Sequence, residues 1–459
     1  MIALFATTFF ILIATIKPFK IYKKININMA TGSLLAVAFL LAGGFVDGEL
    51  IKQGIIGNEF IRPWEIIVIF FNVAYVSVST DVTGVFDYLA YKIVHLAKGN
   101  GLRLFLFFYI FAGLLSIFTS NDIVILTLTP IIFYLGKHAK INVIPLLFAE
   151  FFAANTLSMF LYIDNPTNIM VVNSLGIGFL EYARVMWFPT LVAAVVNFIL
   201  LRIVFRTSIT KVYKIKKLTD FHVRNWIDAF LSLTLMLIMF VSLVLSDTLQ
   251  IPIWHITLFF AGVFIVEDVC FSFYYWKRGR GISLAQRDKR KVILNIPDEK
   301  NEFWMAVKRI PWSILPFVLG FFVIVQAFGD IGFVGIVAQF ISSHVSSLVT
   351  SIGLTGVVSF FMANVINNQP MTIFFTHVFV NESFVMTTQQ LKGSVYALVI
   401  ASNVGANFTI VGALAGLMWK RILDVKGLKI SYIDFFKKGL IITPFVFISA
   451  LAALYVVLM

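Results

Sequence analysis

Long apolar stretches, separated by short polar or basic connections, make up most of the chain. In the first half they cover residues 2–16, 30–46, 64–78, 85–97, 102–118, 123–135, 143–154 and 185–204. In the second half they cover 226–245, 253–273, 312–328, 333–349, 354–363, 371–380, 395–401 and 439–458. A helix of about twenty apolar residues spans the hydrocarbon of a bilayer. The pattern therefore predicts an all-α polytopic membrane protein, in which each half has five apolar runs, a broken pair and a closing helix.

Short polar segments interrupt this pattern at matching places in the two halves. They cover residues 119–122, 155–168, 364–370 and 402–409. Asn121 and Asn155 are 34 residues apart, and Asn367 and Asn403 are 36 apart. Hydrocarbon tolerates such backbone only where protein buries it or where it lines a watery cavity. Interruptions at corresponding places in two halves are typical of the binding site of a secondary transporter.

Simple kinks in ordinary spanning helices are the alternative interpretation of these polar segments. One segment alone would favour a kink, but matched pairs favour two re-entrant hairpins and two broken helices. We therefore expect an inverted-topology repeat whose parts have the following boundaries. The first repeat covers 1–205, with a hairpin at 119–136, a broken helix at 143–170 and a closing helix; a basic cytoplasmic linker covers 206–225; and the second repeat covers 226–459, with a basic cytoplasmic loop at 276–309, a hairpin at 364–381, a broken helix at 395–420 and a closing helix.

The basic residues support opposite orientations of the two repeats. The net charge is +13, and the Lys and Arg residues gather in the connections, where short basic loops stay in the cytoplasm. The connection 17–24 is strongly basic, whereas its counterpart 246–252 contains no Lys or Arg. Conversely, 47–62 is mixed in charge and its counterpart 277–309 is the most basic stretch. Equivalent connections therefore face opposite sides of the membrane, as an inverted repeat predicts.

Composition excludes several other classes of protein. With 60% hydrophobic and 13% charged residues, the chain is no ordinary soluble domain, and its basic connections fit lipid headgroups better than nucleic acid. The run 85–97 is the best candidate for an interfacial helix, and 2–16 is expected to be a retained first span. No metalloprotease, P-loop or nucleophile-elbow motif occurs, so we expect neither an enzyme nor a metal site. Transport must then draw on a coupling ion, H⁺ or Na⁺, or on a partner ATPase, with no other cofactor.

The polar segments supply amide and hydroxyl side chains, which both donate and accept hydrogen bonds. Broken helices add free N–H groups and partial positive charge at their inner N-termini. The expected solute-binding residues are Ser120, Asn121, Asn155, Thr156, Asn168, Asn367, Asn368, Ser402, Asn403, Asn407 and Thr409. Asp122 and Asp164 are candidates for ion coupling, because a carboxylate at membrane depth is costly and usually functional. A helix-capping role is the alternative for each of them.

These motifs resemble those of the ArsB-type arsenite permeases of the ion transporter superfamily, which also contains Na⁺/H⁺ antiporters and dicarboxylate carriers. Ser120-Asn121-Asp122 followed by Thr129-Pro130 is similar to the family's A-N-D…T-P. Asp164 to Ile169 resembles its D-P-x-N-I break, and Leu175 to Tyr182 its L-G-F-x-E-Y. In the second half, Asn367 to Pro370 resembles N-N-x-P. Ser402 to Gly405 resembles the D-x-G break, but the segment lacks the acid, lysine and proline of the arsenite carriers.

The resemblance implies a scaffold and a moving transport region around a site at the membrane midplane. It implies efflux of arsenite or antimonite, driven by an ion gradient, in the plasma membrane of a prokaryote, and it leaves open a homodimer. Coupled transport of a small organic anion such as a dicarboxylate or citrate, or Na⁺/H⁺ exchange, is the alternative. A channel would need a continuous polar stripe, which the halves do not show outside the polar segments.

Overall fold

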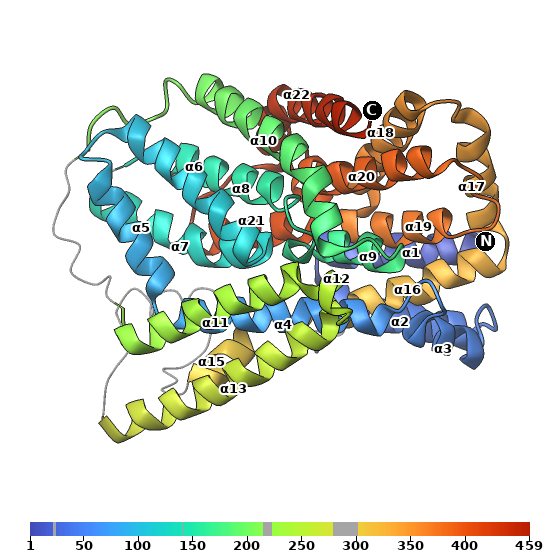
Figure 1. Cartoon of the computed structure of the whole chain (residues 1–459), viewed down its shortest axis with the longest axis horizontal. Coiled ribbons are helices and arrows are strands. Elements are labelled where there is room, and N and C mark those ends of the chain that lie inside the picture. The colour runs from blue at the N-terminus through green and yellow to red at the C-terminus, as the bar shows by residue number, and fades with distance from the viewer. Residues whose placement is uncertain (22–23, 140, 214–222, 279–301) are drawn as a thin grey trace.

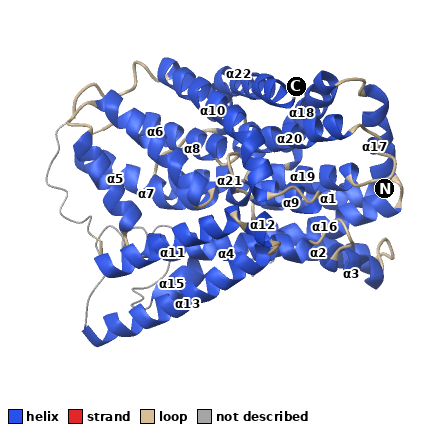
Figure 2. Cartoon of the chain, in the orientation of Figure 1, coloured by secondary structure: helices blue, strands red, loops and turns tan. Residues whose placement is uncertain are grey.

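Helices make up most of the residues that the computed structural model describes, which are 1–21, 24–139, 141–213, 223–278 and 302–459 (Figure 2). Among these residues, eight helical segments are long and apolar enough to cross a membrane. The strands described, β1 (Phe19–Ile21) and β2 (Ile25–Ile27), form one antiparallel hairpin between the first two helices. The predicted fold class, an all-α polytopic membrane protein, is confirmed.

The first half contains long helices, short helices and one break. Its helices are α1 (Ile2–Ile16), α2 (Met29–Ala42), α3 (Gly48–Ile56), α4 (Pro63–Val82), α5 (Val85–Leu96), α6 (Gly101–Phe118), α7 (Asn121–Ala139), α8 (Val143–Leu157), the 3-10 turn η1 (Tyr162–Asp164), α9 (Pro166–Ser174) and α10 (Phe179–Val204). Asparagine starts several of them, because its side chain accepts from the first free N–H groups. Asn100, for example, accepts from the N–H groups of Leu102 and Arg103 at the start of α6.

The second half repeats this succession of elements. Its helices are α11 (Trp226–Val244), α12 (Ser246–Leu249), α13 (Ile253–Arg278), α15 (Glu302–Arg309), α16 (Ile314–Asp330), α17 (Phe333–His344), α18 (Leu348–Ile366), α19 (Asn368–Phe379), α20 (Thr388–Val404), the 3-10 turns η2 (Gly405–Asn407) and η3 (Ile410–Gly412), α21 (Leu414–Val425) and α22 (Tyr432–Leu458). Each closing helix, α10 and α22, contains one internal proline, Pro189 and Pro444 respectively.

Contacts between helices follow the same repetition. Helix α6 packs on α8 and α8 on α10, as α18 packs on α20 and α20 on α22. Helices also cross between the halves in matching pairs: α4 packs on α13 and α16 on α2, while α7 packs on α21 and α19 on α9. Figure 1 shows α2, α4, α11, α13 and α16 together along one side of the bundle, with α6, α8, α10, α20 and α22 along the other.

The two hairpins open toward opposite ends of α10. At the far end of hairpin α6–α7, Gly101 donates its N–H to the carbonyl of Lys211, and Asn142 donates to Ser208 and Thr210, just after α10 ends. Helices α18 and α20 lie together near their starts, and Lys392 of α20 forms an ion pair of 2.7 Å with Glu181 at the start of α10. Helix α10 has 26 residues and is therefore roughly 39 Å long.

Some expected boundaries differ from the structure. Each hairpin turn lies at the beginning of its expected range, 119–136 or 364–381, and the preceding helix, α6 or α18, forms the other arm. The apolar pattern missed this because an arm of a hairpin has the composition of an ordinary span. The interrupted helices are α8 with α9, over 143–174, and α20 with α21, over 388–425, where 143–170 and 395–420 were expected. The basic loop 276–309 falls largely on 279–301, and the linker 206–225 partly on 214–222, both outside the described residues.

Aromatic packing across the halves holds the second break in place. Trp419 of α21 is fully buried, and its ring centroid lies 5.1 Å from that of Phe151 in α8 and 5.7 Å from that of Phe435 in α22. Gly439 of α22 is pressed against the unwound segment: a Cβ there would lie 2.4 Å from the carbonyl oxygen of Phe408 and 2.7 Å from that of Asn407. The position of the break therefore depends on a glycine in the neighbouring helix.

We expect Gly439→Ala to destabilise the protein by about 1–3 kcal/mol, because the added methyl overlaps carbonyl oxygens of the break. Thermal unfolding of the purified protein measures the effect. Gly353→Ala in α18 is the matched control, since a Cβ there meets nothing within 4 Å. That control should be neutral or stabilising, as alanine favours helix by about 1 kcal/mol over glycine. Equal melting temperatures of the two variants would contradict the close contact.

Candidate functional site

Two breaks in buried helices form the framework of the candidate site. Helix α8 ends at Leu157, and α9 restarts at Pro166, whose missing N–H is unneeded at a first helical position. The Asn165 side chain caps α9 by accepting from the N–H of Thr167 at 3.1 Å. In the second half, the Thr409 hydroxyl accepts from the N–H of Gly412 at 3.1 Å and donates to Asn364 at 2.7 Å.

The hairpin tips are buried beside the breaks. Ser120 and Asn121 precede and start α7, and each is 3% exposed. Asn367 lies between α18 and α19 with φ +74° and ψ 150°, and its side chain accepts from the N–H of Gln369 at 3.3 Å. A non-glycine residue in this region carries strain of about 1–3 kcal/mol, which proteins retain mainly at binding or catalytic sites.

One chain of amide hydrogen bonds joins the first hairpin tip to both breaks. Asn121 donates to the Asn155 side-chain oxygen at 2.9 Å, and Asn155 donates to that of Asn407 at 3.1 Å. Asn407 in turn donates to the Thr156 hydroxyl at 3.1 Å. Asn197 of α10 donates to the same hydroxyl at 3.0 Å. Residues more than 250 positions apart thus share one polar network.

A second group of bonds centres on Asn403. Its side-chain oxygen accepts from Ser158 and Asn165, both at 2.8 Å, and its amide donates to Asn168 at 2.7 Å. Ser402 next to it donates to Thr167 at 2.8 Å. Asn403 is fully buried, so a polar side chain there needs such partners. The two breaks are therefore joined by side-chain bonds from both halves of the chain. We call these two groups together the central network.

Three of the expected residues, Ser120, Asn367 and Thr409, lie outside the central network. Asn367 donates to the carbonyl of Val411, and Thr409 donates to Asn364, so these side-chain bonds stay within the second half. Asn368 reaches it by donating to the carbonyl of Ser402 at 3.3 Å. The Ser120 hydroxyl and the Gln369 side-chain oxygen, one in each hairpin tip, are buried with no partner among the described residues. The tips thus hold polar atoms free to bind a solute.

The electrostatics of the site come from helix ends and not from basic side chains. Helices α7, α9 and α19 begin at or next to residues that bond the central network. The dipoles of these helices place partial positive charge there, although capping asparagines already accept from some of their first N–H groups. None of the four polar segments contains Lys or Arg. The site suits a small oxygen-rich solute better than one with several negative charges.

Both candidate coupling carboxylates are buried and adjoin residues of the central network along the chain, Asn121 and Asn165. Asp122 lies in the first turn of α7 and is 4% exposed. Asp164 is fully buried in η1; one oxygen accepts from the N–H of Leu161 at 3.3 Å, and the other has no partner among the described residues. The Leu161 bond is a cap-like contact, as the structural alternative for Asp164 requires. Their coupling role stays a prediction.

Four residues of the central network were missing from the expected binding set. Ser158, Asn165 and Thr167 lie inside the expected segment 155–168, and only their partners across the chain distinguish them from capping residues. Asn197 was missed because it lies in the apolar run of α10, where an isolated asparagine was its only signal. Glu150 is also fully buried, and Thr129 donates to it at 2.8 Å.

Comparisons with known proteins identify the family of the chain. A family model described as "Citrate transporter" matches residues 1–389. The chain belongs to this citrate transporter family. Members of the family are membrane transporters, so the predicted class, a secondary transporter in the plasma membrane, is confirmed.

Several proteins similar to this chain have names that refer to arsenic compounds. The chain is 26% identical over 403 residues to the "Arsenical pump membrane protein" of Escherichia coli (strain K12), covering 85% of this chain and 86% of that protein. It is 25% identical over 403 residues to the protein of the same name in Yersinia enterocolitica, with the same coverage. It is 23% identical over 443 residues to a "46 kDa membrane protein" of Mycobacterium leprae, covering 94% of each. The predicted resemblance to arsenite permeases is confirmed.

We expect Asn155→Ala and Asn407→Ala to be energetically coupled, because their side chains share a bond of 3.1 Å. Each should destabilise the protein by about 1–3 kcal/mol by leaving buried partners unsatisfied. The double variant should depart from additivity by about 0.5–3 kcal/mol in unfolding experiments. Asn381→Ala, in the loop after α19, is the control and should combine additively with Asn155→Ala. Additivity of the first pair would show that the halves are not joined there.

Proposed function

We propose that the protein exports arsenite or antimonite, using an ion gradient. The observation that supports this most strongly is the central network, in which amides and hydroxyls from both halves meet without a basic side chain. The arsenical pump names of several relatives support the choice of solute. Neutral arsenite is small and carries hydroxyl groups, which donate to and accept from such side chains.

The arrangement of the hairpins supports an inverted repeat with one shared site. Hairpin α6–α7 opens beside the end of α10, and hairpin α18–α19 opens toward its start. Both tips nevertheless reach the central network. In this proposal the solute replaces some of the bonds between the breaks, and the two ends of the bundle alternately give access to it.

Asp122 and Asp164 are the proposed carriers of the coupling ion, H⁺ or Na⁺. Neither forms an ion pair with a described Lys or Arg. An ionised carboxylate buried without a partner costs several kcal/mol, so each favours a bound proton or cation in this closed arrangement. A change that opens the network would release the ion, which links ion movement to solute movement.

Coupled transport of a small organic anion is the second candidate, because the family model is described as a citrate transporter. The helix N-termini at the centre could hold a carboxylate, but a tricarboxylate would meet no basic side chain from the four polar segments. Na⁺/H⁺ exchange would use the two aspartates alone. We further propose that the chain has no catalytic activity of its own; a homodimer and a partner ATPase remain compatible with all of these functions.

Cells that express the chain should retain less arsenite than matched cells without it, because export lowers the intracellular pool. Uptake of radiolabelled arsenite, followed over time in both strains, measures this. A variant with both Asn155→Ala and Asn407→Ala is the control and should restore retention to the level of cells without the chain. Unchanged arsenite retention, together with altered citrate retention, would favour the organic-anion alternative.

Asp164→Asn should abolish transport against a gradient but spare exchange of labelled for unlabelled arsenite, if Asp164 carries the coupling proton. Everted membrane vesicles energised with a proton gradient measure both reactions. Asp330→Asn, an exposed position at the end of α16, is the matched control and should leave both unchanged. Intact uphill transport by Asp164→Asn would assign that residue the structural capping role instead.

A further inference from the structure

A pocket with a volume of about 480 Å³ lies away from the central network, where α9 and α19 end. Its lining includes Glu59 and Phe60 from the connection before α4, Asn173 and Ser174 from α9, and Phe379 from α19. The proposed site does not use any of these residues. We call this the outer pocket.

The outer pocket lies at the far ends of two helices that start at the central network. Helix α9 has 9 residues and α19 has 12, so they extend roughly 13–18 Å. Asn168 near the start of α9 bonds Asn403, and Asn368 at the start of α19 bonds Ser402. The two helices pack along each other, one from each half of the chain. A line between them leads from the central network to the outer pocket.

The outer pocket is on the side opposite the basic linker. It lies at the start of α10, since residues 173–176 line it and α10 begins at Phe179. The end of α10 leads to the segment 206–224, whose basic residues predict a cytoplasmic position. At that cytoplasmic end, the backbone N–H of Arg224 donates to the carbonyl of Thr83, just after α4 ends. The start of α4 lies instead near the outer pocket, where Glu65 accepts from Asn173. The outer pocket therefore faces the extracytoplasmic side.

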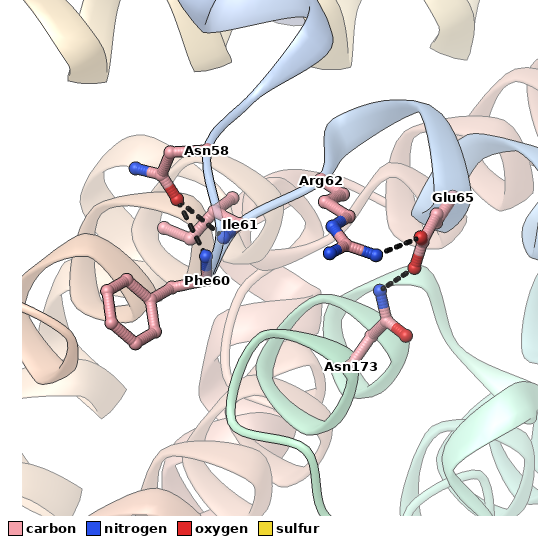
Figure 3. Close-up of polar contacts among 6 residues, drawn as sticks. All are labelled: Asn58, Phe60, Ile61, Arg62, Glu65 and Asn173. Carbon is pink, nitrogen blue, oxygen red and sulfur yellow. Dashed lines mark hydrogen bonds and ion pairs between the residues drawn. The ribbon is translucent and has the colours of Figure 1, made fainter. Parts of the chain in front are cut away.

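Hydrogen bonds fix the wall of the outer pocket, as Figure 3 shows. The Asn58 side chain accepts from the N–H groups of Phe60 and Ile61, at 2.9 and 2.8 Å, and so holds the turn that carries Phe60. Arg62 pairs with Glu65 at 3.0 Å, and the other oxygen of Glu65 accepts from Asn173 at 3.2 Å. The start of α4 is thus tied to the end of α9.

The chemistry of the outer pocket is that of a hydrogen-bond acceptor site. Two helices end there, and their dipoles give this end partial negative charge, although the residues that follow each helix already donate to several of its last carbonyl groups. Glu59 adds a carboxylate. Ser174 is 5% exposed, and its hydroxyl has no hydrogen-bond partner among the described residues. None of the residues that line the pocket is basic, and the charge of nearby Arg62 is paired with Glu65.

We propose that the outer pocket is a second binding site, for a small uncharged solute rich in hydroxyl donors, such as arsenite in its neutral hydroxide form. The solute occupies it on release from the central network. Glu59 and Ser174 accept from its hydroxyls, whereas the carboxylate of Glu59 and the partial negative charge of the helix C-termini repel a citrate-like anion. The choice of arsenite as the solute rests on the proposed function; the preference for an uncharged donor rests on the outer pocket alone.

Equilibrium dialysis of the purified full-length protein against radiolabelled arsenite tests this proposal. The wild-type chain should bind two equivalents, and the variant with both Glu59→Gln and Ser174→Ala should bind one. Glu59→Gln alone should weaken the affinity for the second equivalent at least tenfold. Because Glu59 is exposed, this single variant provides the test even if the double variant misfolds. Glu382→Gln, an exposed control in the loop after α19, should keep both equivalents.

The outcomes separate this proposal from the proposed function. One equivalent in the wild type that the variants lose supports the outer pocket and counts against arsenite at the central network. The proposal for the outer pocket is overturned if the variants bind as many equivalents as the wild type, whether one or two. It is also overturned if the wild type binds no arsenite. Displacement of the variant-sensitive equivalent by an equal concentration of citrate also overturns it, because a pocket that contains Glu59 and no basic side chain disfavours an anion.

Discussion

The structure depends on one requirement: unwound backbone at the depth of the membrane must find hydrogen-bond partners within the protein. Two helices of this chain break in buried surroundings, and hydrocarbon offers nothing to their free N–H and C=O groups. Asparagine, serine and threonine meet the requirement because short polar side chains bond nearby backbone. Once buried, these side chains need partners as well, and several of the partners lie in the opposite half of the chain. The bonds of Asn403 with Ser158, Asn165 and Asn168 are the direct result.

In the proposed function, the same requirement allows a closed structure to exchange its own hydrogen bonds for those of a solute. The central network is largely satisfied by its own side chains, so a solute that enters must replace bonds of similar strength. Exchanging a side-chain partner for the solute therefore costs little free energy. Such an exchange suits a site that opens in turn to each side of the membrane. Hairpins that open at opposite ends of the bundle, with their tips at the same network, give such a site two routes. The glycine contact of α22 and the aromatic packing of Trp419 keep the breaks from drifting apart.

Much of the fold could be predicted from the sequence because hydropathy and breaks are local signals. The apolar runs gave the helices, and the polar segments gave the positions of both breaks. The arms of the hairpins could not be recognised, since α6 and α18 have the composition of spanning helices. The candidate site was predicted in part: Asn121, Asn155, Asn403 and Asn407 do meet, whereas Asn367 and Thr409 bond only their own half. Which asparagines pair across 250 residues is decided by tertiary packing, and no local pattern records it.

A structure determined experimentally with antimonite bound tests the account most directly, because antimony scatters strongly and marks its own position. The account predicts a strong peak within hydrogen-bond distance of Asn121, Asn155 or Asn407, between the two breaks. A peak only at the lipid-facing surface, or breaks that lie apart with their asparagines turned away from one another, would contradict it.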